Sequence, residues 1–91
     1  MAESTPPLED LVAFPSLFVF RAVGEAQDDL PGRCQAALAD SLGRPAELVE
    51  TQPSSAGRFI AVRLGATVHQ PAEIHAVYAA LKAVKGVRLV L

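Results

Sequence analysis

The feature that most constrains this 91-residue chain is a strict two-residue alternation between Arg58 and Val68. Successive side chains of a β-strand point to opposite faces of its sheet, so an alternating segment of this length is predicted to be a strand. One alternating set is wholly apolar and is expected to face the core: Ile60, Val62, Leu64, Ala66 and Val68. The other set is only half polar and is expected to face outward: Phe59, Ala61, Arg63, Gly65 and Thr67.

Three further segments have strand character. The run Leu17–Val23 is apolar on both alternating sets, which is typical of a central strand. The segment 46–52 is polar and is followed by Pro53, so we expect it at an edge of the sheet. A short run, Val87–Leu91, is predicted to be the last strand.

Two segments are predicted to be helices. The first follows the capping residues Asp28 and Asp29 and ends at Gly43, and the second begins at Pro71 and ends at Gly86. Each carries one apolar stripe at helical spacing. The stripes are Leu30, Cys34, Ala37, Leu38 and Leu42 in the first helix, and Ile74, Val77, Tyr78, Leu81 and Val84 in the second.

The resulting order, β-α-β-β-α-β, predicts an α+β fold of the ferredoxin-like type. Its four-stranded antiparallel sheet has the order 4-1-3-2, with both helices on one face. This arrangement puts the two most apolar strands in the centre. We expect one domain over residues 14–91, preceded by an N-terminal tail, residues 1–13, that contains one short helical turn.

Composition narrows the classes of function. The chain is 51% hydrophobic with a net charge of −2, whereas proteins that bind the nucleic-acid backbone usually carry a basic excess. One cysteine, Cys34, and two histidines, His69 and His75, predict no disulfide, no zinc site and no other metal or cofactor. The sequence has no secretory signal and no apolar run of about 20 residues, so we expect a cytoplasmic protein outside the membrane. No nucleophile–base pair or phosphate-binding loop is recognisable, and we expect no catalytic residues.

Several short motifs resemble the YbeD-like family of small bacterial proteins of unknown function. They are Phe14-Pro15, the later Phe18 with Arg21-x-Val23-Gly24, the loop 53–57 (PSSAG) and Gly86-Val87 near the end. The resemblance implies a ferredoxin-like domain similar to the ACT regulatory domains, which bind amino acids and other small effectors between paired domains. The chain departs from the family pattern at Ala56, where a lysine is common, and at Ala61, where a small polar residue is usual.

At 51% hydrophobic, the chain is more apolar than an ordinary monomer of this size needs to be, and we expect part of the surplus on the face of the sheet that the helices leave open. The candidate interaction face consists of Leu17, Val19, Arg21, Phe59, Ala61 and Arg63. Burial of its apolar members by a second sheet would place the two arginines at the margin of the contact or against a carboxylate. Side-by-side pairing through an edge strand is the competing geometry. Arg88 or its neighbours would join the face from the last strand.

Two hypotheses of function follow. The first is a non-catalytic regulatory or binding domain that acts through a homodimer, another protein partner or a small-molecule effector, at the sheet face or a dimer interface. The second is an RNA-binding domain that uses Phe59, Arg21 and Arg63 on the open sheet face. Against the second, Ala61 occupies the position of the second stacking aromatic, and the chain is acidic overall.

Overall fold

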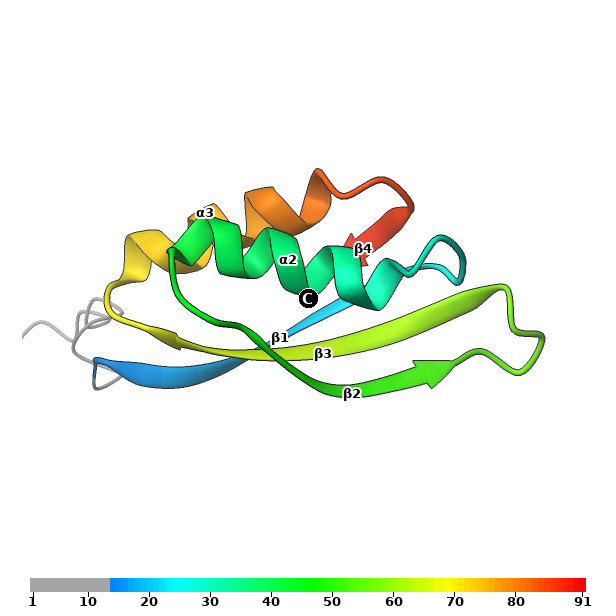
Figure 1. Ribbon diagram of the computed structural model, residues 1–91, viewed down its shortest axis with the longest axis horizontal. Coiled ribbons are helices and arrows are strands. Elements are labelled where there is room, and N and C mark those ends of the chain that lie inside the picture. Colours follow the sequence, from blue (N-terminus) through cyan, green and yellow to red (C-terminus); the bar gives the residue numbers. More distant parts are fainter. Residues whose placement is uncertain (1–13) are drawn as a thin grey trace, which may run out of the picture.

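The computed structural model describes residues 14–91, which form a four-stranded sheet and two helices (Figure 1). In chain order the elements are β1 (Ser16–Glu25), α2 (Leu30–Leu42), β2 (Glu47–Pro53), β3 (Phe59–Val68), α3 (Pro71–Lys82) and β4 (Val87–Val90). The sheet has the order β2-β3-β1-β4, and every neighbouring pair is antiparallel. The predicted ferredoxin-like topology is therefore confirmed.

The two central strands are paired along their whole length. Ten residues of β1 face ten residues of β3, from Ser16 opposite Val68 to Glu25 opposite Phe59. All seven residues of β2 are exposed, which confirms the prediction of an edge strand. The pairing of β2 shifts between Leu48 and Glu50, and the pairing of β1 with β4 shifts between Val23 and Gly24. Such bulges change which side chains share a face.

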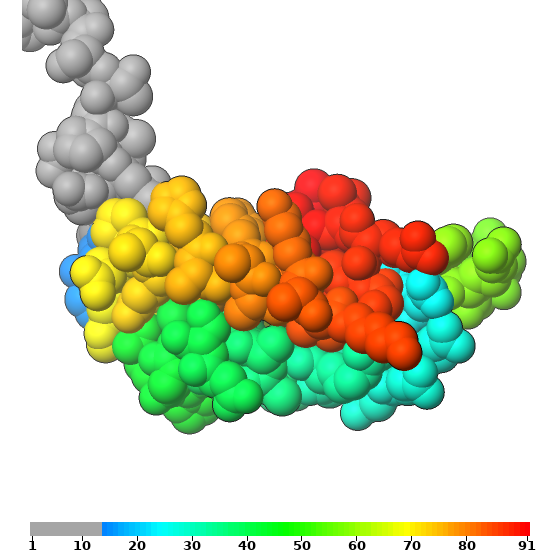
Figure 2. All heavy atoms as spheres, turned by 90° about the horizontal axis from the view of Figure 1, so that it is seen from above, coloured from blue at the N-terminus to red at the C-terminus, as the bar shows by residue number. Residues whose placement is uncertain are grey.

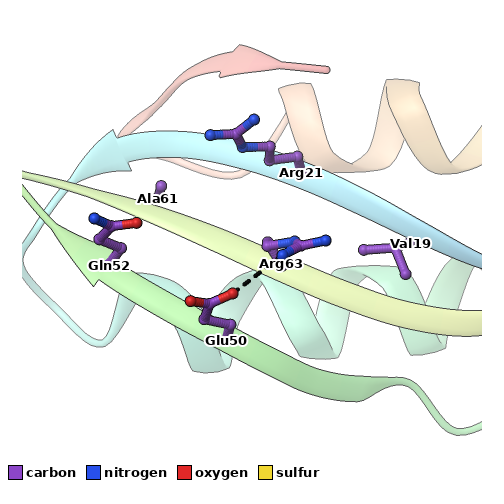
Figure 3. A pocket seen from close by; sticks show the side chains of 6 residues that line it. All are labelled: Val19, Arg21, Glu50, Gln52, Ala61 and Arg63. Carbon is purple, nitrogen blue, oxygen red and sulfur yellow. Dashed lines mark hydrogen bonds and ion pairs between the residues drawn. The ribbon is translucent and has the colours of Figure 1, made fainter.

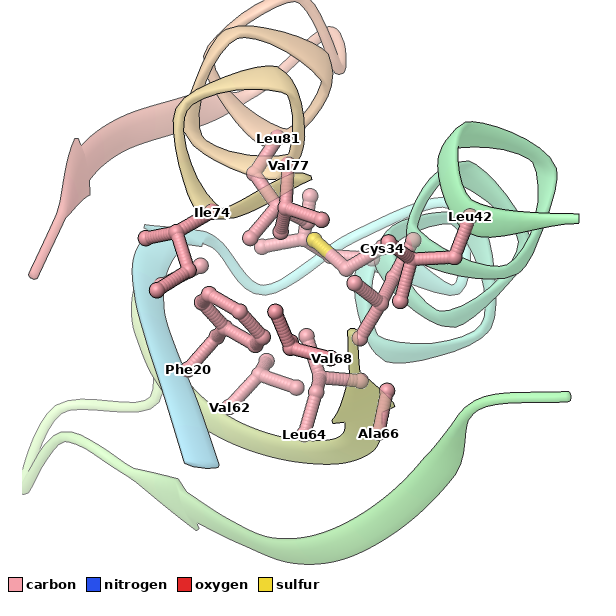
Figure 4. Packing of buried hydrophobic residues seen from close by; sticks show 13 residues of the cluster. Phe20, Cys34, Leu42, Val62, Leu64, Ala66, Val68, Ile74, Val77 and Leu81 are labelled. Carbon is pink, nitrogen blue, oxygen red and sulfur yellow. The ribbon is translucent and has the colours of Figure 1, made fainter. Parts of the chain in front are cut away.

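The helices α2 and α3 lie side by side on one face of the sheet (Figure 1). Seen from above, their atoms cover most of the sheet beneath them (Figure 2). The core fills the space between the two layers, where side chains of β1 and β3 meet both helices (Figure 4). Its buried members are Phe20, Ala22, Leu30, Cys34, Leu38, Leu42, Val62, Leu64, Ala66, Val68, Ile74, Val77 and Leu81. Of the residues of β3 expected in the core, only Ile60 is partly exposed.

The ends of the elements correct some of the predicted boundaries. The first helix is capped as expected, because the Asp29 carboxylate accepts a hydrogen bond from the Gly32 N–H and Gly43 closes the helix in a left-handed conformation. The second helix ends at Lys82, four residues before Gly86, which instead forms the turn into β4. The first strand begins at Ser16, after Phe14-Pro15. The predicted tail, residues 1–13, lies outside the described residues.

A close approach of backbones joins β4 to the sheet. The Glu25 N–H donates to the Gly86 carbonyl oxygen over 2.9 Å. A side chain on Gly24 would collide with that carbonyl and would lie 2.9 Å from the Val87 Cα. The Arg33 guanidinium fixes the same region, because it donates to backbone carbonyls of both the loop before α2 and the turn before β4. The hydrogen-bond acceptors are the oxygens of Gln27, Asp28 and Lys85.

Candidate binding surface

The face of the sheet that turns away from α2 and α3, here called the open face, carries all six residues of the predicted interaction face. Leu17, Val19 and Arg21 come from β1, and Phe59, Ala61 and Arg63 come from β3. The alternation of the two strands puts them there, because their chain neighbours Phe20, Val62 and Leu64 are buried on the helical side. Leu17 is 67% exposed and Val19 is 48% exposed, which is unusual for side chains of this kind in central strands.

Four of the six residues line one hollow of about 380 Å³. Figure 3 shows Val19 and Arg21 along β1 and Ala61 and Arg63 along β3. Two side chains of β2, Glu50 and Gln52, lie on the other side of β3 from β1. Gln52 lies opposite Ala61 in the strand pairing, and Glu50 lies opposite Arg63. The short side chain of Ala61 leaves room between Arg21 and Gln52.

The other two predicted residues lie at opposite ends of the open face. Leu17 faces Thr67 in the pairing of β1 with β3, whereas Phe59 faces Glu25. The two positions, Leu17 and Glu25 on β1, are eight residue steps apart, which corresponds to about 27 Å. Arg21 lies directly opposite Arg63 near the centre of the paired strands, so both arginines occupy the middle of the open face.

The charges of the open face form two ion pairs. Arg63 donates to the Glu50 carboxylate over 3.1 Å, and Arg88, which joins the face from β4, donates to the Glu25 carboxylate over 2.7 Å. The hydrogen bonds from Arg88 and from Gln27 lower the pKa of Glu25 below its ordinary value. At the same end of the face, the Arg58 guanidinium lies 5.5 Å from the centre of the Phe59 ring.

An apolar patch adjoins the hollow and includes a residue that the sequence did not indicate, Val49 of β2. A Cβ placed on Gly65 would lie 3.3 Å from Val49 Cγ2 and 3.7 Å from Leu17 Cδ1, so these two side chains approach each other over the glycine. Val49, like Val19, is about half exposed. The patch Leu17, Val19 and Val49 therefore offers apolar surface that no residue between 14 and 91 covers.

Several thiol, hydroxyl and carboxyl groups of the described residues take part in packing, capping or hydrogen bonding within the fold. Cys34 is buried in the core, and this burial raises the pKa of its thiol and disfavours the nucleophilic thiolate. The Ser54 hydroxyl accepts a hydrogen bond from the Phe59 N–H, and Asp29 caps α2. The Glu73 carboxylate accepts a hydrogen bond from the His69 backbone N–H and pairs with Arg44.

Within residues 14–91, no group of three or more His, Cys, Asp or Glu side chains is arranged to hold a metal ion. Among the described helices, none has the length and apolar character needed to cross a membrane.

The open face combines exposed apolar side chains with arginine side chains. Arginine is enriched in protein–protein interfaces, whose buried centres are largely apolar.

Comparison with known proteins agrees with this fold. The chain is similar to UPF0250 proteins of Shewanella halifaxensis (37% identity) and Shewanella loihica (32% identity). These alignments cover 91% and 90% of this chain, and 93% and 92% of the relatives. The solution structure of HP0495 from Helicobacter pylori matches with a TM-score of 0.74 at 17% identity, covering 98% of both chains. A second solution structure of HP0495 matches with a TM-score of 0.62.

A family model described as "Protein of unknown function (DUF493)" matches residues 9–91. Together with the UPF0250 relatives, this match confirms the resemblance to the YbeD-like proteins that the sequence motifs indicated. The chain therefore belongs to the DUF493 family, a family of small bacterial proteins of unknown function.

Proposed function

We propose that this protein is a non-catalytic binding domain that acts by associating with another protein through the open face of its sheet. The observation that carries this proposal is the apolar patch Leu17, Val19 and Val49 beside the arginine-lined hollow. The core of the domain is already closed by α2 and α3 on the opposite face. The exposed aliphatic side chains of this patch therefore lie outside the core, whereas a partner would bury them.

The shape of the open face favours a protein over a small effector. Sites for small molecules are concave and bury most of the ligand surface. The hollow is lined by side chains of three neighbouring strands, and its lining includes no residue of a helix or a connecting loop. A protruding side chain of a partner, held by contacts over the surrounding sheet, suits such a surface better than a free molecule. A regulatory role of the ACT-like kind would be exerted through this association.

RNA binding is the alternative, and one observation favours it. Phe59 and Arg58, stacked on each other at one end of the face, offer an aromatic ring and a cation of the kind that bind bases and phosphates. However, Ala61 provides no second ring, and the ion pairs with Glu25 and Glu50 offset two of the arginines. A salt-titrated binding assay with single-stranded RNA separates this alternative, because electrostatic binding to RNA weakens steeply with salt.

Site-specific photocrosslinking in the native bacterium tests the proposal. The full-length chain would carry the crosslinking amino acid p-benzoylphenylalanine at Val19 or Thr67 on the open face. Matched controls carry it at Ala36 of α2 or Ala79 of α3, which are exposed on the helical layer. We expect one common protein adduct from Val19 and Thr67 and none of that mass from Ala36 and Ala79.

The substitution Leu17→Asp is the second part of the photocrosslinking test. It puts a charge into the apolar patch at an exposed position, so we expect it to abolish the adduct at Thr67 while leaving the thermal unfolding midpoint unchanged within a few degrees. Adducts that are equal at all four positions, or that resist Leu17→Asp, would contradict the proposal. An adduct that disappears on nuclease treatment would assign the face to RNA instead.

A further inference from the structure

One arginine of the described domain has no partner. Residues 14–91 contain six arginines, and five of them are engaged by other groups. The engaged five are Arg33 with backbone carbonyls, Arg44 with Glu73, Arg58 over Phe59, Arg63 with Glu50 and Arg88 with Glu25. The Arg21 side chain forms neither a hydrogen bond nor an ion pair with any residue between 14 and 91.

The unpaired side chain of Arg21 also lies next to a second positive charge. Its direct neighbour across the central pair of strands is Arg63, and like charges opposite each other on adjacent strands destabilise a sheet. The Glu50 carboxylate is held by Arg63, so it compensates only one of the two positive charges. The wall of the hollow therefore carries an excess of one positive charge, located at Arg21.

We propose that the hollow receives a carboxylate side chain of the protein partner and that Arg21 is the residue that binds it. The inference rests on the proposed function. A guanidinium presents its N–H donors in a planar fork that matches a carboxylate with two parallel hydrogen bonds. Gln52 lies diagonally across the hollow from Arg21, beyond Ala61, and its amide group borders the same space (Figure 3). One excess positive charge fits a singly charged group.

The surroundings of the hollow specify the partner further. The apolar patch Leu17, Val19 and Val49 lies beside it, so the partner surface would place aliphatic side chains next to an Asp or Glu. A second copy of this chain is a poor fit in a symmetric arrangement. A two-fold axis through the hollow would place two hollows against each other, each with one excess positive charge, and like charges in an interface are unfavourable. The partner is therefore a different protein with an acidic and apolar surface.

A titration followed by NMR tests the site without knowledge of the partner. The ¹⁵N-labelled full-length chain would be titrated with N-acetyl-glutamate N-methylamide, which mimics a Glu side chain in a protein. The glutamine analogue is the uncharged control. We expect the Arg21 Nε–H and the Ala61 amide signals to shift with the glutamate compound only. Arg21→Gln should remove the response, whereas the matched control Arg58→Gln should retain it.

Two further measurements test whether the group that binds Arg21 is a phosphate or a carboxylate of this chain itself, rather than a carboxylate of a protein partner. Dimethyl phosphate mimics the RNA backbone, and a larger response to it than to the glutamate compound would overturn the inference. The chain itself has three carboxylates in its first 13 residues, Glu3, Glu9 and Asp10. Their replacement by the corresponding amides in the full-length chain should leave the Arg21 signal unchanged. A displaced signal would show that the chain occupies its own hollow, which also contradicts the inference.

The photocrosslinking assay then separates this inference from the proposed function. We expect Arg21→Gln to reduce the adduct at Thr67 about tenfold, because a hydrogen-bonded charge pair is lost from the interface. If Leu17→Asp abolishes the adduct and Arg21→Gln leaves it intact, the carboxylate site is refuted and the binding face stands. If no adduct forms from the open face in the unsubstituted chain, the proposed function fails and the inference fails with it.

Discussion

Two leucines on opposite faces of the same sheet test the assignment of the open face. Leu64 of β3 is completely buried, whereas Leu17 of β1 is 67% exposed. Both residues lie in the paired strands β1 and β3, but Leu64 has a paired strand on each side, whereas Leu17 is paired with β3 alone. Replacement of each leucine by alanine removes the same side-chain atoms and leaves the backbone hydrogen bonds in place, so the difference between the two variants reflects mainly their difference in burial.

The expected magnitudes follow from this burial. Leu64 lies opposite Phe20 on β1 and opposite Leu48 on β2, and the backbone of a central strand cannot close the space that a shortened side chain leaves. We therefore expect Leu64→Ala to lower the free energy of unfolding by about 3 kcal/mol, within the usual range of about 2–5 kcal/mol for such changes. Leu17→Ala should cost less than about 0.5 kcal/mol, because most of that side chain is already in water.

Thermal unfolding followed by far-UV circular dichroism measures the difference. For a domain of this size each kcal/mol corresponds to about 4–8 °C in midpoint, so Leu64→Ala should unfold about 12–24 °C below the unsubstituted chain. Leu17→Ala should unfold within a few degrees of it. Similar losses in both variants would show that the face carrying Leu17 is buried in the isolated chain, and the proposed binding surface would be refuted.

Three other predictions test the fold and its charges. Gly24→Ala should lower the free energy of unfolding in urea by about 3 kcal/mol, because the new Cβ meets the backbone of Gly86 and Val87. A loss below about 1 kcal/mol would refute this close packing. The hydrogen bond from the His69 N–H and the neighbouring Arg44 lower the pKa of Glu73. Ionised Glu73 therefore stabilises the fold fully above the ordinary pKa of 4.5, and this stabilisation is lost as the pH falls through the lowered pKa. Stability measured against pH should therefore fall more steeply in acid for the unsubstituted chain than for Glu73→Gln, and parallel curves would contradict this. Cys34 should react with a thiol reagent far more slowly in the native chain than in urea, because burial raises its pKa and blocks access, and equal rates would place it at the surface.

Periodicity in the sequence predicted the elements well because it reflects which side chains reach the core. The alternation in β3 assigned Val62, Leu64, Ala66 and Val68 to the buried face, and all four are buried. The end of α3 was missed because Gly86 was interpreted as its cap. The helix instead ends at Lys82, and Gly86 has a positive φ in the turn where its carbonyl meets β1.

The candidate site was predictable only in part. Alternation identified Arg21 and Arg63 as residues of the outer face, but it gave no information about Val49, Glu50 and Gln52. These residues belong to a polar edge strand whose pairing shifts between Leu48 and Glu50. A shift of one residue exchanges the faces of a strand, and nothing in the local pattern of β2 reveals where the shift occurs.

The sequence by itself determined the order of the elements, the two central strands, the edge strand and the face that each central side chain occupies. These are local properties, because they follow from the spacing of apolar residues along one segment. Only the tertiary structure decided that Arg21 faces Arg63, that Glu50 compensates one of them and that Ala61 leaves a hollow between Arg21 and Gln52. Neighbours across strands depend on register and bulges, which are set when distant segments pack together.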